Sequence, residues 1–272
     1  MTDKLSQFSI ARPSMGYWRV TFSNPPINLL TPETIIELQE LIDRIESDDQ
    51  LRVVVFDSAH PDFFLGRYDL SRVAETPREP GPTGLPPFVD FTTRLSRASA
   101  VSIALIRGRT RGGGSEFALA CDMRFASVER AIFGQPEVAA GFIPGGGAIE
   151  RLPGLVGRAR ALEIVLSADD FDASTAERYG WVNRALPDAE LDDFVDSLAR
   201  RLASFDRQPL TEAKRLVNRT SLPAPEDFVE TLEVFLGAAA WPSTRERRVR
   251  LVARAKEAGL DFEMRMGYHL GL

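Results

Sequence analysis

Two runs of three consecutive glycines, residues 112–114 and 145–147, restrict the fold of this chain more than any other feature. Without a Cβ atom, glycine adopts positive φ angles and lets other groups approach the main chain closely. The first run leads into an apolar, helix-forming stretch that ends before Asp122. The two runs therefore predict tight turns, and the first one predicts a turn that opens a helix.

A glutamate accompanies each of these turns. Glu116 follows the first run, and Glu137 precedes the second. At the start of a helix the first N–H groups lack intrahelical acceptors, and the positive end of the helix dipole points the same way. Such groups form a natural site for a negatively charged oxygen. A neighbouring carboxylate can move a proton on the bound molecule, so the pattern predicts an acid–base site beside an anion-stabilising main chain.

Folding alone offers a second explanation for both features. A triple glycine before a helix can be only a tight turn, and most of the 39 acidic residues of the chain are expected at the surface, exposed to solvent. The combination of two glycine-rich turns, each with a carboxylate at its edge, favours the catalytic interpretation over the purely structural one.

The overall composition is that of an ordinary soluble globular protein. At 272 residues the chain is long enough for one large domain or for a core with a helical appendage. The net charge of −6 argues against a surface for nucleic acid or for an anionic membrane. A local basic cluster with helical spacing predicts a solvated helix face or, alternatively, a site for a phosphate-bearing ligand or a partner subunit. Its members are Arg245, Arg247, Arg248, Arg250 and Arg254.

Cysteine, histidine and the start of the chain suggest neither secretion nor a metal site. The single cysteine, Cys121, excludes an intramolecular disulfide and is expected in the core. The two histidines, His60 and His269, cannot make a zinc site alone, so we predict no bound metal. Residues 1–6 lack the apolar stretch of a secretory signal, and no stretch approaches the roughly 20 apolar residues that span a bilayer. A cytoplasmic location is therefore expected.

The first half of the chain predicts a mixed α/β fold. Alternating apolar residues at positions 8–12 and 17–22 favour a β-hairpin. Thr31 offers an N-cap for a helix whose first residue is proline. Short apolar runs at residues 52–57 and 101–106 predict buried strands. This order, with glycine-rich connections, suggests right-handed βαβ units and a largely parallel sheet.

The second half predicts mostly helices. Helical spacing of apolar residues continues beyond the second glycine run at residues 159–166, 173–179, 189–204, 210–219, 225–236 and 244–258. Residues 181–185 predict one last short strand. Residues 76–87, rich in Pro and Gly, are typical of a mobile loop that serves either as a lid or as surface filler. We divide the chain into a core of residues 1–200 and a helical region of residues 201–272.

Several segments together resemble the crotonase superfamily, the enoyl-CoA hydratase/isomerase family. The similarity extends from about Trp18 to Pro187. It includes residues 24–30, 63–70, 111–126 and 143–147. The resemblance implies an α/β fold with a spiral core of ββα units and a C-terminal helical region that covers the site and buries subunit contacts. It also implies a homotrimer or a dimer of trimers.

The resemblance further implies a substrate and a set of site residues. The substrate would be an acyl-CoA thioester whose carbonyl oxygen gains charge as an enolate between the N–H groups of Gly66 and Gly113. One such donor is typically worth roughly 3–4 kcal/mol of transition-state stabilisation. Glu116 and Glu137 occupy the positions of two glutamates that hold the water added across the 2,3 double bond. No cofactor is implied beyond the CoA of the substrate.

The two glutamates are expected to divide the proton transfers between them. We assign Glu137 chiefly to proton transfer at the α-carbon and Glu116 to activation of the water. Burial and a like-charged neighbour should raise the pKa of one of the two carboxyls. Because close carboxylates titrate as a coupled pair, the division of roles stays open at this point.

The segment that would line the CoA ester, Gly66, Arg67, Tyr68 and Asp69 together with Gly113, departs from the family pattern. The family usually has Ala-Gly at the first two of these positions and a small residue in place of Tyr68. The tyrosine side chain could narrow the acyl or pantetheine channel. Arg67 is either exposed or bound to a phosphate or carboxylate of the substrate, since arginine binds such groups bidentately.

Three kinds of function remain open. The first is hydration of trans-2-enoyl-CoA, which the presence of both glutamates favours and which would belong to fatty acid metabolism. The second keeps the enolate chemistry but ends in isomerisation, decarboxylation, hydrolysis or C–C cleavage, because a fold does not fix a function. The third is a non-catalytic paralogue that binds acyl-CoA. The altered loop 66–68 favours this third function. The tail 251–272 also does not resemble the usual end of the family.

Overall fold

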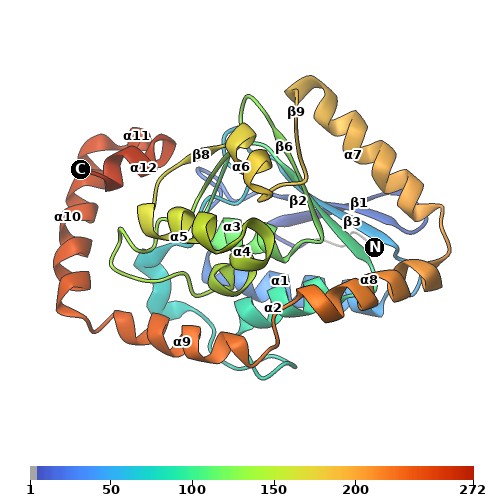
Figure 1. Ribbon diagram of the computed structural model, residues 1–272, viewed down its shortest axis with the longest axis horizontal. Coiled ribbons are helices and arrows are strands. Elements are labelled where there is room, and N and C mark those ends of the chain that lie inside the picture. The colour runs from blue at the N-terminus through green and yellow to red at the C-terminus, as the bar shows by residue number, and fades with distance from the viewer. Residues whose placement is uncertain (1–4) are drawn as a thin grey trace.

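A six-stranded sheet lies at the centre of the computed structural model, which describes residues 5–272 (Figure 1). In spatial order its strands are β1 (Phe8–Ser14), β2 (Tyr17–Phe22), β3 (Val53–Ser58), β4 (Val101–Ile106), β6 (Met123–Ser127) and β9 (Arg184–Leu186). β1 and β2 form an antiparallel hairpin, and every following pair of neighbours is parallel. The predicted hairpin and the largely parallel sheet are thus confirmed. The first four residues of the segment tested for a secretory signal lie outside the described residues.

A second, three-stranded sheet leads into the first glycine run. It consists of β5 (Arg109–Arg111), β7 (Ile132–Gly134) and β8 (Phe171–Asp172), with β5 parallel to β7 and β7 antiparallel to β8. Helix α3 (Gly113–Ala120) begins directly after β5. The end of this small sheet therefore fixes the position of the turn that opens α3.

Helices surround both sheets and dominate the second half of the chain. They are α1 (Pro32–Ser47), α2 (Pro87–Arg97), α4 (Ala148–Val156), α5 (Arg158–Ser167), α6 (Ala173–Tyr179), α7 (Asp188–Ala203), α8 (Arg207–Ser221), α9 (Asp227–Ala238), α10 (Pro242–Ala258), α11 (Leu260–Met264) and α12 (Met266–Leu270), together with the 3₁₀-helix η1 (Leu70–Glu75). The predicted α/β fold class, with a helical C-terminal region, is confirmed.

The large sheet separates two hydrophobic cores. Successive side chains of a strand point to opposite faces. Accordingly Val54 of β3 belongs to the main core with α1, α2 and α3, whereas Val55 belongs to a smaller core with α7. Leu191 and Val195 of α7 are fully or almost fully buried in this smaller core. Figure 1 shows α7 set apart from the helices of the main core.

The start of α1 follows the predicted cap. The Thr31 side chain accepts a hydrogen bond from Thr34 N at 3.4 Å, and Thr34 Oγ1 accepts one from Thr31 N at 2.9 Å. This reciprocal arrangement satisfies donors that lack intrahelical acceptors. The apolar residues that predicted the helix, Ile35, Leu38, Leu41, Ile42 and Ile45, are all buried.

Two helices near the site were not predicted. α2 begins at Pro87, where the predicted loop ends, and it buries several polar residues, among them Asp90 and Thr93, that blur its apolar spacing. α4 begins directly after the second glycine run and contains Pro153, which removes one i→i−4 hydrogen bond. The loop before α2 is tied to it by Thr83, whose N–H and hydroxyl donate to Asp90 Oδ1 at 2.9 and 2.7 Å.

The predicted helices of the second half agree with α5 to α10 to within three residues at each end. The last strand, β9, begins later than predicted. Cys121 is buried as expected, and burial raises the pKa of its thiol to about 12. No helix within residues 5–272 has the length and apolar character needed to cross a membrane. The division at residue 200 stays a prediction.

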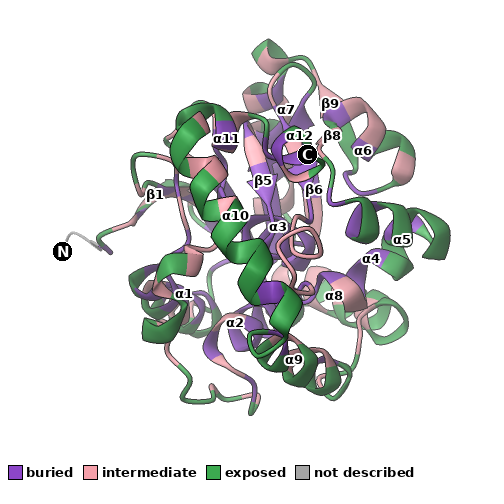
Figure 2. Ribbon diagram, turned by 90° about the vertical axis from the view of Figure 1, so that its left-hand side faces the viewer, coloured by how far each residue is buried: buried purple, intermediate pink, exposed green. Residues whose placement is uncertain are grey.

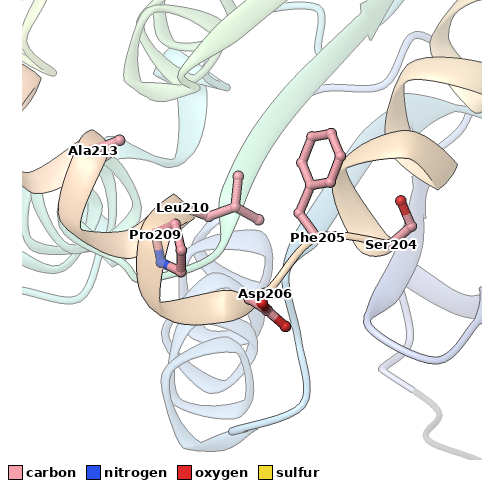
Figure 3. A pocket seen from close by; sticks show the side chains of 6 residues that line it. All are labelled: Ser204, Phe205, Asp206, Pro209, Leu210 and Ala213. Carbon is pink, nitrogen blue, oxygen red and sulfur yellow. The ribbon is translucent and has the colours of Figure 1, made fainter.

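A hollow of about 450 Å³ lies at the bend between α7 and α8 (Figure 3). It is lined by Ser204, Phe205, Asp206, Pro209, Leu210 and Ala213. These side chains offer one carboxylate and no second charged or nucleophilic group beside it except a serine hydroxyl. The hollow therefore lacks a pair of carboxyl groups such as the one predicted beside the two glycine runs.

Candidate active site

The first glycine run is required by backbone geometry at two of its three positions. Gly112 has φ = 50°, a conformation that residues with a side chain rarely adopt. A Cβ atom on Gly114 would lie only 1.9 Å from Leu65 O, so α3 can approach the strand-like segment at Leu65 only because glycine stands there. Gly112 O then accepts the N–H of Glu116 at 2.9 Å, and α3 begins. The turn and the close approach explain why the run precedes this helix.

Glu116 lies inside the protein in the first turn of α3. The residue is 4% exposed. Its Oε1 accepts hydrogen bonds from Gly146 N at 2.7 Å and from Ala148 N at 3.3 Å. The second glycine run thus holds the glutamate that follows the first. Burial raises the pKa of Glu116 to about 7, although the two backbone hydrogen bonds oppose this rise by stabilising the carboxylate.

Arg151 holds the same turn from its other side. Its Nη1 donates to Gly146 O at 3.4 Å and to Gly147 O at 3.3 Å. The arginine is 5% exposed, and its charge acts to lower the pKa of Glu116. Glu116 thus binds N–H groups of the turn at residues 146–148, and Arg151 binds carbonyl groups of the same turn. The orientation of the Glu116 carboxyl follows from this arrangement.

Glu137 follows β7 and reaches the first glycine turn. Its Oε1 lies 2.7 Å from the point where a Cβ atom on Gly112 would stand. Its Oε2 is buried and has no hydrogen-bond partner within residues 5–272. Burial first, and then the charge of Glu116, raise the pKa of Glu137 well above its usual value. The structure therefore brings both predicted glutamates to one site, with both carboxyls shielded from solvent.

These raised pKa values predict that the protein loses stability as the pH rises. In the unfolded chain the two carboxyls titrate near 4.5, whereas in the folded chain the pKa of Glu116 is about 7 and that of Glu137 is also raised. Above pH 4.5 the folded state therefore binds more protons than the unfolded state. The free energy of unfolding should fall with pH in this window, by about 1.4 kcal/mol per pH unit for each fully affected carboxyl.

The variant Glu137→Gln removes one of these carboxyls and should gain stability where the wild type loses it. We expect its Tm to exceed that of the wild type at about pH 8, and the difference to shrink at about pH 5. Thermal unfolding followed by circular dichroism at both pH values measures this. An equal Tm difference at the two values would mean that the carboxyl titrates normally in the folded protein.

Gly66, which was predicted to donate its N–H to the substrate oxygen, is already engaged. Its N–H donates to Asn28 O at 2.8 Å. A Cβ atom on Gly66 would lie 2.6 Å from Ile27 O, so the glycine allows this close contact between two backbone segments. The structure therefore contradicts Gly66 as the donor: its role is to pack the segment after β3 against residues 27–28.

Tyr68 presents its N–H to the site instead. Leu30 and Tyr68 form a parallel bridge in which Leu30 N donates to Arg67 O at 2.8 Å and Asp69 N donates to Leu30 O at 2.9 Å. In such a bridge the N–H and C=O of the central residue, Tyr68, point away from the partner strand. Within residues 5–272 the Tyr68 N–H has no protein acceptor. It lies 3.9 Å from the position of a Cβ atom on Gly113.

Gly113 keeps the position that was predicted for it. It is the first residue of α3, so its N–H has no intrahelical acceptor, and none elsewhere within the described residues. The N–H groups of Tyr68 and Gly113 are thus neighbours, and both lie beside the turn that the Glu137 carboxyl reaches. These two N–H groups are therefore the candidate donors to an acceptor oxygen.

The side chains of residues 67–69 bind protein groups. Arg67 forms a bidentate pair with Glu263 of α11, with Nη2–Oε1 and Nε–Oε2 distances of 2.5 and 3.2 Å. Arg67 was predicted to be exposed or to bind a phosphate or carboxylate of the substrate; in the structure it is instead paired with Glu263 of the same chain. The Tyr68 hydroxyl contacts Thr76 Oγ1. Asp69 caps η1 by accepting the N–H of Ser71 at 3.0 Å.

Aromatic residues that sequence analysis missed close around the carboxyls. Phe88 Cε1 lies 2.6 Å from the position of a Cβ atom on Gly146, and the Phe235 ring lies 2.5 Å from that on Gly145. The rings of Phe142 and Phe235 are 6.2 Å apart. These residues belong to α2, α9 and the turn before the second glycine run. Their meeting depends on the fold, and no local pattern signals it.

Helix α10 runs across the outer side of the site (Figure 2). Arg248 Nη2 donates to Leu70 O at 3.4 Å, and Arg247 Nη1 donates to Ala139 O at 2.9 Å. One contact lies just after the segment 66–69 and the other just after Glu137. Apart from the half-buried Arg254, the arginines of the predicted basic cluster are exposed, as expected for a solvated face. No group of His, Cys, Asp and Glu side chains in the described part of the chain is placed to hold a metal.

Comparison with known proteins shows the family of this chain. Residues 14–235 match the model of the family described as enoyl-CoA hydratase/isomerase. The chain is 33% identical over 205 residues to a short-chain-enoyl-CoA hydratase from Clostridium acetobutylicum, an alignment that covers 74% of this chain and 77% of that protein. It is 31% identical over 210 residues to a carnitinyl-CoA dehydratase from Escherichia coli, with 77% and 80% covered.

A solved structure is similar over the whole chain. The crystal structure of a candidate enoyl-CoA hydratase from Streptomyces avermitilis is 43% identical and has a TM-score of 0.93, with 100% of this chain and 98% of that chain covered. The family model spans most of the sequence, including both glycine runs and both glutamates. The resemblance that these segments suggested is thereby confirmed, and the chain belongs to the enoyl-CoA hydratase/isomerase family.

Proposed function

We propose that this protein is an enzyme that adds water across the 2,3 double bond of an enoyl-CoA thioester. The observation that carries the proposal is the pair of shielded carboxyls, Glu116 and Glu137, beside two unpaired N–H groups. Hydration needs a base for the water, an acid for the α-carbon and stabilisation of an enolate between the two steps. The site supplies a group for each requirement.

The thioester oxygen is placed between the N–H groups of Tyr68 and Gly113. Negative charge develops on this oxygen when the β-carbon is attacked. Donors fixed in advance stabilise that charge without reorganisation, and a single donor typically contributes roughly 3–4 kcal/mol. The N-terminal end of α3, to which Gly113 belongs, adds its positive dipole at the same place.

The two carboxyls divide the proton transfers of hydration between them. Glu116, with a pKa of about 7, is partly ionised and takes a proton from the water as its oxygen bonds to C3. Glu137, whose pKa is raised well above its usual value by burial and by the charge of Glu116, gives a proton to C2 of the enolate. The proton returns from Glu116 to Glu137 through solvent when the product leaves.

The comparisons support hydration over the other outcomes of enolate chemistry. Relatives at 33% and 31% identity are named for adding or removing water at a CoA thioester. In addition, Arg67 is paired with Glu263, so its guanidinium does not require a specialised acyl group as its partner. Isomerisation, decarboxylation, hydrolysis and C–C cleavage have no observation of their own in this site, and neither does a non-catalytic binding role.

We also propose the cofactor requirement, the cellular location and the oligomeric state of the enzyme. It needs no cofactor beyond the CoA of its substrate, acts in the cytoplasm on fatty acyl thioesters, and assembles as a homotrimer or a dimer of trimers. Exposed apolar side chains on the C-terminal helices and at the start of α10 support the assembly, because a large apolar surface is normally covered. They include Leu216, Val217, Leu236, Trp241, Val249 and Val252, which are 42–71% exposed.

Incubation of the pure protein with crotonyl-CoA tests the proposed reaction. We expect the absorbance of the conjugated thioester to disappear, with 3-hydroxybutyryl-CoA as the product identified by mass spectrometry. The double variant Glu116→Gln/Glu137→Gln is the control and should lose turnover while keeping the fold. The absence of turnover by the wild type with short, medium and long enoyl-CoA would contradict the proposal.

A further inference from the structure

One residue of α11, Glu263, contacts both walls of the proposed oxyanion site. Its carboxylate forms the bidentate pair with Arg67, and its main-chain carbonyl accepts a hydrogen bond from Arg111 Nη1 at 2.6 Å. Arg67 directly precedes Tyr68, and Arg111 lies two positions before Gly113. The two N–H groups that face the thioester oxygen therefore follow the two arginines that Glu263 binds.

The Arg67 guanidinium links the tail to the main-chain carbonyl of Tyr68. Its third nitrogen, Nη1, donates to Tyr68 O at 3.0 Å, while the other two are held by Glu263. The Arg67 and Glu263 side chains are 23% and 12% exposed, so solvent screens the pair only weakly. Charge-assisted bidentate pairs fix orientation as well as distance. Through Arg67, the Glu263 carboxylate thus holds the carbonyl group of Tyr68 and restrains the main chain directly after the Tyr68 N–H.

The Arg111 guanidinium links the tail to the first glycine run. Its side chain is 2% exposed and pairs with Asp170 through Nε–Oδ1 and Nη2–Oδ2 distances of 2.6 and 2.7 Å. Met264 O accepts further bonds, from Arg109 Nε at 3.2 Å and Arg111 Nη2 at 3.4 Å. Strand β5, which ends one residue before Gly112, is therefore held by the same short stretch of tail that holds Arg67.

We propose that Glu263 is a positioning residue that holds the N–H groups of Tyr68 and Gly113 at the separation a thioester oxygen requires. The proposal rests on the proposed function for the identity of that oxygen. Catalysis by such donors depends on their placement before the reaction. A displacement of about 1 Å can lower a rate roughly 10²-fold. Arg67 and the tail, which both depart from the family pattern, then serve one common purpose, the positioning of the two donors.

Steady-state kinetics with crotonyl-CoA test this coupling. Glu263→Gln should lower kcat by about tenfold or more with a smaller change in KM, because the donors act most strongly in the transition state. Arg67→Gln should cause a similar loss, and the double variant should lose little more than either single variant. Glu263→Asp, which keeps the charge, should retain most of the activity and serves if Glu263→Gln does not fold.

A matched control breaks a similar ion pair far from the site. Asp188→Asn removes one of two carboxylate partners of Arg107, whose Nε lies 2.7 Å from Asp188 Oδ1 where α7 meets the end of β4; the second partner, Asp192, stays in place with its Oδ2 2.8 Å from Arg107 Nη1. The Arg107 and Asp188 side chains are 20% and 34% exposed, so the pair is comparably shielded. This variant should leave kcat unchanged. A loss of kcat equal to that of Glu263→Gln would overturn the proposal, since it would reflect general destabilisation.

The infrared band of a bound carbonyl gives a second measurement that needs no turnover. The probe is [1-¹³C]butyryl-CoA, a saturated thioester that cannot be hydrated. Hydrogen bonds from both donors should shift its C=O band to lower frequency on binding to the wild type, and Glu263→Gln should reduce that shift without a comparable change in Kd. Equal shifts in the two proteins, or no shift in the wild type, would overturn the proposal. Failure of the wild type to hydrate crotonyl-CoA would instead contradict only the proposed function.

Discussion

Replacement of Glu137 by Gln should lower kcat by about 10²–10⁴, the range expected when a positioned proton donor is lost. Glutamine has the shape of a protonated glutamic acid but cannot give up a proton to C2 of the enolate. Because the side chain keeps its size, binding of the thioester should change far less than turnover. The stability of this variant at alkaline pH should rise at the same time, so the loss of activity cannot come from unfolding.

The measurement is the initial rate with crotonyl-CoA at saturating and at low substrate, which separates kcat from KM. Glu163→Gln is a suitable control, because Glu163 is an α5 carboxylate that binds the Tyr179 hydroxyl at 2.9 Å outside the site. It should match the wild type. If Glu137→Gln kept its kcat to within about threefold, the proton at C2 would have to come from another group.

Gly113→Pro should lower kcat by about 10²–10³, because proline removes one of the two N–H donors to the thioester oxygen. The helix itself tolerates the change, since Gly113 is the first residue of α3, a position at which proline is common. The preceding residue is glycine, which has no Cβ atom to clash with the proline ring. The loss should therefore fall on the chemical step more than on the fold.

Gly113→Ala separates the donor from the added bulk. Alanine keeps the N–H, and its Cβ would meet Leu30 Cδ1 at 3.0 Å, a contact that the proline ring also makes at its Cβ. We expect the alanine variant to keep most of its kcat once Leu30 adjusts. Equal losses in both variants, measured with crotonyl-CoA and with circular dichroism spectra that match the wild type, would assign the effect to crowding and remove Gly113 from the list of donors.

Local patterns predicted the elements whose interactions are local. Alternation of apolar residues identified the β1–β2 hairpin, and the Thr31 cap located the start of α1. The glutamates could be identified because each stands beside a glycine run, which demands its own backbone geometry. A raised pKa was expected for one of the two carboxyls, and the structure shows it for both Glu116 and Glu137.

Features that depend on distant contacts could not be predicted. The choice of Tyr68 over Gly66 as a donor depends on the bridge to Leu30, which decides which N–H points outward. Sequence spacing contains no signal for that direction. Likewise Arg67 and Glu263 are 196 positions apart, so no periodicity connects them. Helix α2 escaped prediction because its buried polar residues interrupt the usual apolar stripe.

The main-chain oxygens of residues 263 and 264 accept hydrogen bonds from Arg111 and Arg109. Of the three arginines, only Arg67 binds a side chain there, that of Glu263. Peptide oxygens are common to all twenty amino acids, so these bonds require no particular side chain at residue 264, whereas Phe262 and Met266 on either side are buried. The length of this part of the tail is constrained, because one inserted residue would rotate the oxygens out of reach of the arginines. Tails that differ in sequence can therefore still bind the same arginines through their main-chain oxygens.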